Sequence, residues 1–349
     1  MNGIVDMRSD TVTLPTDAMR AAMARAEVGD DVNAEDPTVN ELEEYAADLF
    51  GKEAALFVTS GTQGNAVAMM AHTVPGDLVY CETRAHVGHY EGGGPAALAG
   101  VTLEKISCDR GILTAERVEE AMEPEDVHLA VPRVIWAENT SNGGGGTCMT
   151  VAEMEGLRAL ANRYGLKIHV DGARIFNAAA GLGVSVKDLA AAADTVQFCL
   201  SKGLGAPVGS MVVGPRSFRK AAHRKRKMLG GGLRQAGVIA AAGMVALKET
   251  PPLIPLDHAN ARSLAQGIAE IPGLLIDPDG VETNLVYFGY EAGVVDSKRF
   301  VGQLSERGYL IGGARKGVSR ACTHHQVSAD DVGGALAAMR EAAAAASPA

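Results

Sequence analysis

The feature that most constrains the fold is a regular alternation of short apolar runs with segments of helical character. The runs have the length of strands and occupy residues 54–58, 78–81, 129–136, 166–170, 195–200 and 210–213. Such alternation is typical of strand–helix–strand units, which build a mainly parallel sheet. We therefore predict an α/β fold with a mainly parallel, mixed sheet.

Several helix boundaries can be placed from capping chemistry. Asp36-Pro37 puts an acceptor side chain before a proline at the first helical position, and Thr150-x-x-Glu153 has the spacing of a capping box. Gly51 and Gly165 each follow an aromatic residue at an expected helix end, where a left-handed residue is common.

The pattern changes after Pro251-Pro252, which indicates a second domain. A long helix-like stretch is followed by expected strands at residues 283–290, 309–311 and 318–323 and by an alanine-rich helix, of which residues 342–349 are expected to fray. A chain of 349 residues also exceeds the usual size of a single core. We expect an N-terminal arm and large domain at residues 1–250, and a small α+β domain at residues 251–349.

Composition argues against nucleic acid as a partner. Charged residues make up 21% of the chain and the formal net charge is −10, so no basic surface dominates. The one basic run, residues 216–227, fits a polyanion patch or a solvated helix face, and we interpret it as the latter. Partners are expected to be small molecules.

The cysteines and the hydropathy pattern bear on location. Five cysteines, an odd number, are scattered without a CxxC spacing, which fits a reduced, cytoplasmic protein. The first ten residues lack an apolar signal core, and no stretch reaches about eighteen uninterrupted apolar residues. We expect neither export nor a membrane span, and assign no metal site.

An acid and a lysine at neighbouring strand ends carry the most chemical information. Asp171 ends one apolar run, and Lys202 follows the next between a serine and a glycine. The acid alone fits a helix cap equally well, but a lysine after a buried run can act as a desolvated nucleophile. Together they are what pyridoxal phosphate (PLP) requires: an amine to bind it, and a carboxylate to keep its pyridine nitrogen protonated.

Two glycine-containing turns are candidates for binding the phosphate. Ser60-Gly61-Thr62 follows a strand and opens a helix, whose N-terminal amides favour an anion, although ordinary strand-to-helix turns have similar residues. Arg234 follows three glycines and offers a second cationic group, or the glycines form a simple hinge. Neither turn has the GK[ST] of a nucleotide-binding loop.

Seven segments carry a more specific pattern. In chain order they are MRSDTVT (7–13), VGDDV (28–32), DPT (36–38), GKEAA (51–55), SGTQ (60–63), HVDGARIF (169–176) and LSKGLG (200–205). With these motifs the sequence resembles the low-specificity L-threonine aldolases, PLP enzymes of the superfamily that includes β-eliminating lyases. The match spans almost the whole chain except residues 251–317. It implies an aspartate-aminotransferase-like large domain (PLP fold type I).

The resemblance implies roles for residues around the cofactor. Lys202 would bind PLP and act in catalysis, Asp171 would pair with the pyridine nitrogen, and Arg174 would lie near the phenolic oxygen. The phosphate would be bound by Ser60, Gly61 and Thr62, with help from Arg234 and Lys227, and in the family such contacts can cross a subunit boundary.

The resemblance also implies residues that meet the substrate. Ser9 and Arg320 would bind its carboxylate, for which a planar guanidinium is suited. His86 matches a ring-stacking histidine and is a candidate base for the substrate β-hydroxyl, since imidazole titrates near neutral pH, although an isolated histidine is more often structural. His128 matches a second histidine near the substrate. Tyr90 would lie near the β-substituent.

Two departures from the family pattern concern pocket shape. Ser141-Asn142-Gly143 replaces the usual His-Asn-Gly and continues into three more glycines, and residues 87–90 are smaller than in many relatives. The preferred aldehyde is therefore open.

The resemblance implies cleavage of L-threonine, L-allo-threonine and related β-hydroxy-α-amino acids, including phenylserine, to glycine and an aldehyde. A PLP-dependent β-eliminating lyase or aminotransferase is the alternative, because the acid and lysine fix the cofactor but not the bond that breaks. A non-catalytic binding protein on the same fold is a third. The family also implies a homotetramer, a dimer of dimers with active sites at a dimer interface.

Overall fold

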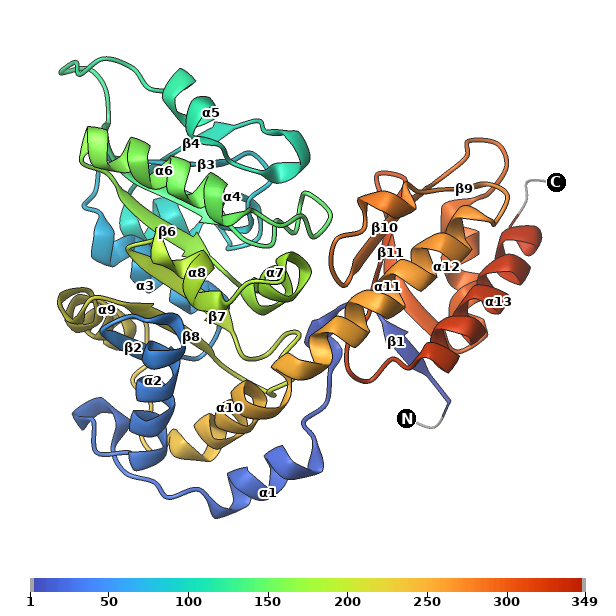
Figure 1. The fold of residues 1–349 in the computed structure, drawn as a ribbon, viewed down its shortest axis with the longest axis horizontal. Coiled ribbons are helices and arrows are strands. Elements are labelled where there is room, and N and C mark those ends of the chain that lie inside the picture. The colour runs from blue at the N-terminus through green and yellow to red at the C-terminus, as the bar shows by residue number, and fades with distance from the viewer. Residues whose placement is uncertain (1–2, 347–349) are drawn as a thin grey trace. The chain divides into compact units, whose positions relative to one another are not determined.

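The computed structural model describes residues 3–346, which form two compact units (Figure 1). The larger unit comprises residues 14–251. The smaller unit comprises residues 252–346 together with residues 3–13. The N-terminal residues, which we expected to accompany the large domain, thus group with the C-terminal part of the chain.

The larger unit is built on a seven-stranded sheet. Its strands lie in the order β2 (Ala54–Val58), β8 (Ser210–Gly214), β7 (Thr195–Cys199), β6 (Lys167–Asp171), β5 (Val131–Glu138), β3 (Asp77–Glu82) and β4 (Thr102–Ile106). Only β8 runs antiparallel to its neighbours. The predicted mainly parallel sheet is confirmed. Strand β4 was not predicted, because it lies at the sheet edge with three of its five residues exposed.

Helices pack on both faces of this sheet (Figure 1). They are α1 (Asp17–Arg25), α2 (Pro37–Phe50), α3 (Gly61–His72), α4 (His86–His89), α5 (Ala115–Glu120), α6 (Val151–Tyr164), α7 (Ile175–Leu182), α8 (Val186–Ala191), α9 (Arg216–Met228) and α10 (Gly237–Glu249). Short helical turns occupy Asp31–Asn33, Pro95–Ala99 and Asp109–Gly111.

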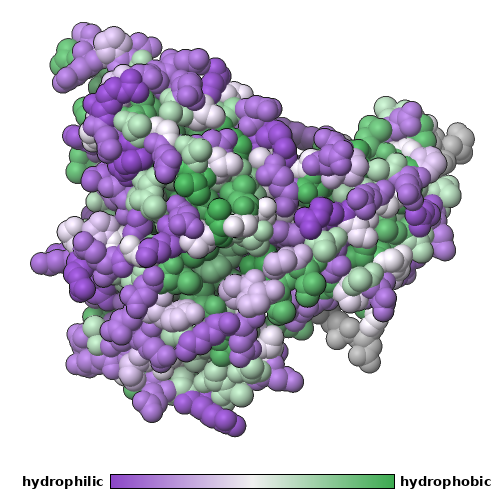
Figure 2. All heavy atoms as spheres, in the orientation of Figure 1, coloured by the Kyte–Doolittle hydropathy of each residue, from purple (hydrophilic) through white to green (hydrophobic). Residues whose placement is uncertain are grey.

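The two faces have separate apolar cores. On one face, Leu56 and Trp136 of the sheet pack with Val67 of α3 and Phe218 of α9. On the other face, Phe50 of α2 stacks on Phe198 of β7 with ring centroids 4.6 Å apart. Burial of such side chains is the main stabilising contribution to the unit. At the surface seen in Figure 2, hydrophilic residues cover both margins of the larger unit and hydrophobic residues gather between them.

The predicted helix caps are confirmed. Asp36 accepts a hydrogen bond from Val39 N at 3.0 Å, and Thr150 forms a reciprocal capping box with Glu153. Gly51 and Gly165 end their helices with φ of 61° and 68°, the left-handed conformation that favours glycine.

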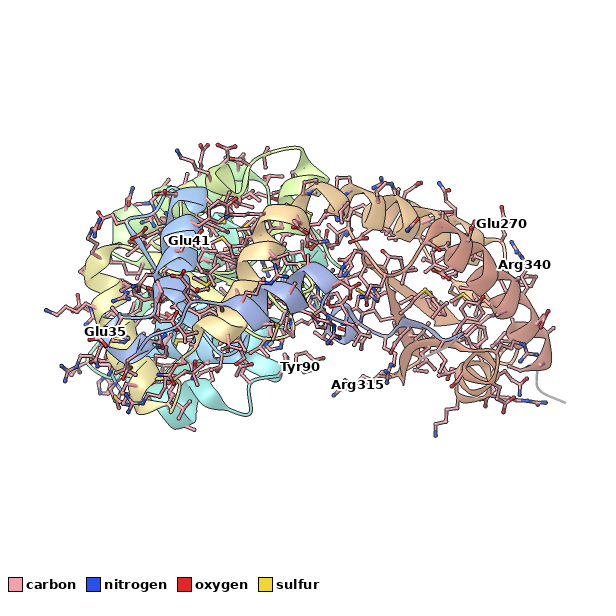
Figure 3. The ribbon with its side chains drawn as sticks, turned by 90° about the horizontal axis from the view of Figure 1, so that it is seen from below. Glu35, Glu41, Tyr90, Glu270, Arg315 and Arg340 are labelled. Carbon is pink, nitrogen blue, oxygen red and sulfur yellow. The ribbon has the colours of Figure 1, made fainter. Side chains whose placement is uncertain are left out.

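The smaller unit is a five-stranded sheet with helices. Its strands lie in the order β1 (Val5–Met7), β11 (Tyr309–Arg315), β12 (Val318–Cys322), β10 (Leu285–Tyr290) and β9 (Leu274–Leu275), and only β1 with β11 is a parallel pair. The helices are α11 (Ile254–Ala269), α12 (Ser297–Glu306) and α13 (Ala329–Ala345), with short turns at Asp10–Val12, Pro251–Leu253 and Pro278–Gly280. Glu270, just past α11, and Arg340 of α13 form an exposed ion pair at 3.4 Å (Figure 3).

The end of α13 corrects one expectation. Ala342 and Ala346 are fully buried in the core of the smaller unit, beside Met339. The predicted fraying is therefore wrong as far as residue 346, because these alanine side chains pack in the core of the unit, where α13 contacts α11 and α12. Residues 347–349, the rest of that segment, lie outside the described residues.

Two further expectations concern cysteines and hydropathy. All five cysteines are free and buried. Between residues 3 and 346, no single helix has both the length and the apolar character needed to cross a membrane; one bent pair, Gly237–Glu249 with Pro251–Ala269, meets those criteria by length and composition.

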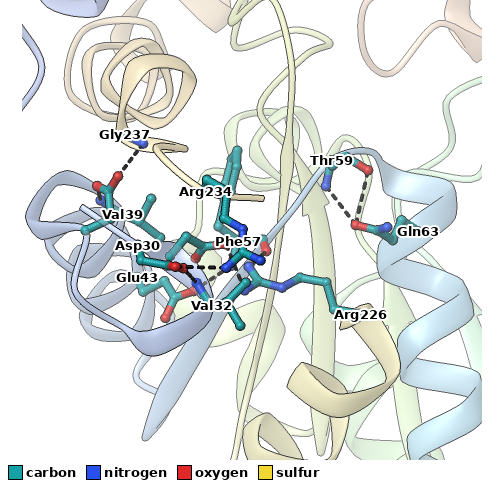
Figure 4. A network of polar contacts seen from close by, with 12 residues as sticks. Asp30, Val32, Val39, Glu43, Phe57, Thr59, Gln63, Arg226, Arg234 and Gly237 are labelled. Atoms are coloured by element: carbon teal, nitrogen blue, oxygen red, sulfur yellow. Dashed lines mark hydrogen bonds and ion pairs between the residues drawn. The ribbon is translucent and has the colours of Figure 1, made fainter. Parts of the chain in front are cut away.

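The basic run on α9 is not wholly a solvated face. Arg226 is buried: its Nη1 donates to Phe57 O at 2.7 Å and its Nη2 lies 2.9 Å from Asp31 Oδ2 (Figure 4). Arg219 pairs with the buried Glu43 at 2.8 Å. The interpretation of the run as a solvated face is thus wrong for Arg226, whose charge is compensated inside the unit.

Candidate active site

The candidate site of the larger unit starts at the carboxyl ends of β5, β6 and β7, where parallel sheets place their ligands. Glu138 ends β5 opposite Asp171, which ends β6, and Asn139 N donates to Asp171 O at 2.9 Å. Lys202 lies three residues beyond β7. Its loop turns back on itself, since Gly205 N donates to Lys202 O at 2.8 Å and Leu200 N to Gly209 O at 3.1 Å.

Asp171 is held rigidly below the surface. Its side chain is buried, with Oδ2 accepting from Asn65 Nδ2 at 2.7 Å and Oδ1 accepting from Ala173 N at 3.1 Å. Two donors therefore fix the position of a carboxylate that could pair with a cationic ring nitrogen.

His86 is brought to the same cluster from the loop after β3. Its backbone N donates to Glu138 Oε2 at 2.6 Å, and its ring Nδ1 lies 2.8 Å from Glu91 Oε1. The hydrogen bond to Glu91 raises the pKa of His86, and the charge of Asp171 acts in the same direction. The charge of Lys202 acts in the opposite direction on the pKa of His86.

Tyr90 lies at the rim of this cluster. Its ring centroid is 5.5 Å from that of His86, and its side chain is exposed and projects outward (Figure 3). The structure thus places Tyr90 beside the predicted base, on its solvent side.

Glu138 anchors two loops at once. Its Oε2 accepts from His86 N and its Oε1 accepts from Asn142 N at 2.8 Å. Burial raises the pKa of Glu138 to about 7, and the neighbouring charge of Asp171 adds to the shift. The buried carboxyl therefore serves as an acceptor that fixes the backbone around the site.

Arg174 lies under the loop that departs from the family pattern. It is buried, and its Nη1 donates to Asn142 Oδ1 at 3.5 Å. The glycine loop is closely packed: a Cβ at Gly143 would lie 2.6 Å from Arg84 Cβ, and a Cβ at Gly144 would overlap Arg110 O. These glycines allow close approach of three chain segments rather than making the loop more flexible.

The predicted phosphate turn opens α3. Ser60 caps the helix by accepting from Gln63 N at 3.1 Å, and Ser60 and Thr62 are exposed. A Cβ at Gly61 would lie 2.8 Å from Cys199 Sγ, so only glycine lets the helix start this close to β7. The free amides of this helix start favour an anion.

Arg234 and Lys227 lie near this turn through a glycine loop. Gly231 packs against Gln63, with no room for a Cβ, and the side chain of Lys227 passes Gly232. Arg234 Nη1 binds Asp30 Oδ2 at 2.8 Å, and its side chain is 61% exposed (Figure 4). Within residues 3–346, no hydrogen bond joins either cation to Ser60 or Thr62.

His128 is not brought to the cluster within this chain. It is exposed in the connection before β5 and is bound to Asp126, with Nδ1 2.6 Å from Oδ1. β5 begins at Val131 and ends at Glu138, so His128 lies at the amino end of the strand and the cluster lies at its carboxyl end.

Ser9 and Arg320 come together in the smaller unit. Arg320 Nη2 donates to Arg8 O at 3.0 Å, next to Ser9, which caps the following turn by accepting from Thr11 N at 3.3 Å. Two ends of the chain thus supply a hydroxyl and a guanidinium to one region of this unit.

The sequence analysis missed three residues of the site: Asn65, Glu91 and Glu138. Asn65 Nδ2 donates to Glu91 Oε1 at 2.6 Å as well as to Asp171. Asn65 lies two residues past the SGTQ motif, but its contacts reach Glu91 and Asp171 across 26 and 106 positions of the sequence. The one available signal for these roles was Asn65, a polar residue buried in the first turns of α3.

The geometry also bears on metal binding and on cavities. Ligand atoms of His86, Glu91 and Asp171 lie within 4.8 Å of one another, a set that could hold an ion. The Asn65 amide, however, already bridges the two carboxylates. The cavity beside Asn65 and Glu91 has about 30 Å³, enough for a single water but not for a cofactor.

Comparison with known proteins decides the family. The β-eliminating lyase family model matches residues 6–290. Low-specificity L-threonine aldolase 1 of Arabidopsis thaliana is 44% identical over 343 residues, covering 97% of this chain and 96% of the relative. This chain belongs to the low-specificity L-threonine aldolase family. The low specificity L-threonine aldolase of Escherichia coli K12 is 39% identical, covering 94% of this chain and 96% of the relative. The predicted family and its enzyme class, a lyase, are confirmed.

Solved structures support the fold of this family member. A threonine aldolase of Leishmania major superposes with a TM-score of 0.82 at 18% identity, covering 97% of this chain and 99% of that one. A serine palmitoyltransferase of Sphingomonas wittichii gives 0.77 at 16% identity, covering 98% and 88%. The predicted fold class is thereby confirmed.

Proposed function

We propose that this aldolase family member cleaves L-threonine, L-allo-threonine and related β-hydroxy-α-amino acids, including phenylserine, to glycine and an aldehyde, with PLP as its cofactor. One observation carries the proposal: the buried Asp171 carboxylate, fixed by Asn65, lies at the same strand ends as the loop of Lys202. Asn65 and Glu91 join this carboxylate to His86 through hydrogen bonds. The names of the relatives, low-specificity L-threonine aldolases, support L-threonine as a substrate.

The residues present fit PLP. Asp171 offers a desolvated carboxylate for a protonated pyridine nitrogen, and Lys202 offers an amine. The start of α3, kept open by Gly61, offers amides and two hydroxyls for a phosphate. Arg174 is a buried cation for the phenolic oxygen, and we assign Arg234 and Lys227 to the phosphate side.

The early steps of the cleavage have residues to serve them, and the donor of the last proton, to the substrate Cα, is unassigned. When bound, PLP supplies the electron sink for the charge left on the substrate Cα. The Asp171 carboxylate keeps the proton on the ring nitrogen. His86 Nε2 accepts the proton of the β-hydroxyl, because Nδ1 is engaged by Glu91. Lys202 would hold the cofactor through its side-chain amine. Ser9 and Arg320 bind the substrate carboxylate. Tyr90 contacts the β-substituent of the substrate. His128 also stays a proposed substrate contact, although its position in the structure does not support this role.

A second activity is kept because of the family model, whose description is β-eliminating lyase. The same acid and lysine would also serve β-elimination or amino transfer. The products separate these reactions: the aldolase releases glycine and an aldehyde, whereas the alternatives release keto acids.

The test is a product analysis of the PLP-loaded protein with L-threonine, L-allo-threonine and phenylserine. We expect equal amounts of glycine and aldehyde. Keto acid in place of aldehyde would establish the alternative, and no turnover of any of the three would contradict both.

We further propose that the protein is a cytoplasmic homo-oligomer, a dimer of dimers with active sites at a dimer interface. Free cysteines suit a reducing compartment. In the larger unit, Leu14 and Val238 are exposed apolar residues, and a groove of about 340 Å³ is lined by Pro15, Met23 and Val238. The molar mass by light scattering tests this proposal: a monomer would contradict it.

A further inference from the structure

A continuous hydrogen-bonded chain connects the predicted base to the predicted ring partner. His86 Nδ1 lies 2.8 Å from Glu91 Oε1, Asn65 Nδ2 lies 2.6 Å from the same oxygen, and Asn65 Nδ2 lies 2.7 Å from Asp171 Oδ2. Glu91 and Asn65 are both buried.

The direction of each hydrogen bond follows from the groups involved. The Asn65 amide has two N–H groups, and it faces two carboxylate oxygens that only accept. The reversed amide would set its carbonyl against both carboxylates. Asn65 Oδ1 is buried and has no hydrogen-bond partner among residues 3–346, so the two bonds from Nδ2 fix the orientation of the amide.

The same reasoning fixes the imidazole. An ionised Glu91 only accepts, so His86 donates from Nδ1 and its Nε2 is left as the unprotonated nitrogen. A base needs that free lone pair. The ring is also anchored through its backbone, since His86 N donates to Glu138 Oε2 and His86 O accepts from Tyr90 N at 2.8 Å.

The pKa of Glu91 reflects opposing effects within this hydrogen-bonded chain. Burial raises the pKa of Glu91, and the charge of Asp171 raises it further, while the hydrogen bonds from His86 and Asn65 lower it. Asn65 separates the two carboxylates without adding charge. A carboxylate at this position would add a third negative group, and an apolar side chain would leave two carboxylates facing each other.

We propose that Glu91 and Asn65 are positioning residues of the active site: Glu91 fixes the His86 tautomer that leaves Nε2 free, and Asn65 couples Glu91 to Asp171. The proposal rests on the proposed function in one respect, because it takes His86 as the base. Glu91 therefore acts on the proton transfer through His86, and Asn65 acts on both the base and the cofactor partner.

The two residues should be separable by experiment. In Glu91→Gln the amide oxygen can still accept from His86 and Asn65, but the negative charge is gone. The pKa of His86 should fall by about 1 unit or more. Asp171 keeps its partner, so PLP affinity should be unchanged. In Asn65→Leu both carboxylates lose their shared donor, and PLP affinity should fall by about 10-fold or more.

The decisive readout uses the apo-protein and does not depend on turnover. Nitrogen chemical shifts of ¹⁵N-histidine report the tautomer and the titration midpoint of each ring, and His86→Gln identifies the signal. We expect Nδ1–H in the wild-type ring, a lower midpoint in Glu91→Gln, and recovery of the midpoint in Glu91→Asp. Glu44→Gln, which removes an exposed charge on α2, is the matched control and should change nothing.

The pH profile of kcat/KM provides a second readout. Since His86 must be neutral to accept a proton, the acid limb should move down with its pKa in Glu91→Gln, and the plateau should fall by about 10-fold because a weaker base reacts more slowly. An Nε2–H tautomer in the wild type, or a His86 midpoint equal in Glu91→Gln and Glu44→Gln, would overturn the proposal. If PLP does not bind at all, the proposed function fails. The nitrogen chemical shifts of His86 would still test the positioning role of Glu91.

Discussion

At the scale of single residues, the site depends on groups whose charge is held by a few donors. Asp171 is the central case, because its buried carboxylate accepts from Asn65 Nδ2 and Ala173 N and could still pair with one cation.

We predict that Asp171→Asn lowers both PLP affinity and kcat by about 10- to 100-fold, the effect of losing one hydrogen bond to a charged group. The amide keeps the shape but cannot hold a proton on the ring nitrogen. The measurements are a PLP titration and steady-state kinetics on L-threonine. Asp48→Asn, an exposed residue of α2, is the control, and equal behaviour of the two variants would refute this role.

Residue positions were predictable where a motif carries them, as for Asp171 and Lys202 at or after strand ends and Ser60 at a helix start, while their roles stay predictions. Glu91 and Asn65 were not, because their partners come from other elements. For His128 the sequence predicts a role that its position in the structure does not support. Its motif predicts a substrate contact, but the chain places it before β5, at the wrong end of the strand for this cluster.

At the scale of elements, caps and close approaches decide where helices and loops lie. Asp36 caps α2 and also accepts from Gly29 N at 3.2 Å and Gly237 N at 2.8 Å, all from a fully buried position. It therefore joins the start of α2 to the start of α10.

Asp36→Ala should lower the free energy of unfolding by about 3 kcal/mol, since it removes a cap and leaves buried N–H groups without an acceptor. Thr114→Ala, which removes the single 3.4 Å cap of α5, should lower it by about 1 kcal/mol or less. Denaturant unfolding of the two variants checks this; similar losses would show that the bonds to Gly29 and Gly237 contribute nothing.

Element prediction succeeded where the pattern is apolar and bounded by caps. β2 was placed at its observed bounds, and α2 and α6 begin at the predicted caps. β4 has an exposed face and β1 has three residues, so neither produces an apolar run. Edge strands are set by their neighbours more than by their own sequence.

At the scale of the whole molecule, the stability should depend on pH through buried histidines. His72 Nε2 and His169 Nδ1 both lie 2.8 Å from the Thr195 hydroxyl. Burial lowers the pKa of His72 to about 4 and lowers that of His169 well below its ordinary value. Between pH 4 and pH 6.5 the unfolded chain binds protons that the folded chain does not, so acid favours unfolding in that window.

We predict that His72 alone accounts for about 2 kcal/mol of the stability change between pH 7 and pH 5. The buried carboxyls Glu138 and Asp257 act in the opposite direction, because burial raises their pKa to about 7 and the folded chain then binds the extra proton. Comparing urea unfolding of the wild type and His72→Gln at both pH values cancels the carboxyls. An identical pH dependence in the two proteins would contradict the prediction.

The organisation of the molecule was only partly visible in the sequence. The change of pattern at Pro251-Pro252 marks the boundary between the two units, but nothing in residues 3–13 shows that β1 pairs with β11 across 300 positions. Such long-range pairing follows from the tertiary fold rather than from local propensity.

The central claim is that Lys202 holds PLP beside Asp171 in an aldolase site. The most direct test is to load the protein with PLP, reduce it with borohydride and locate the modified peptide by mass spectrometry, in the wild type and in Lys202→Ala. The account predicts one phosphopyridoxyl group, on Lys202, and none in the variant. A group on another lysine, or equal labelling in Lys202→Ala, would contradict it.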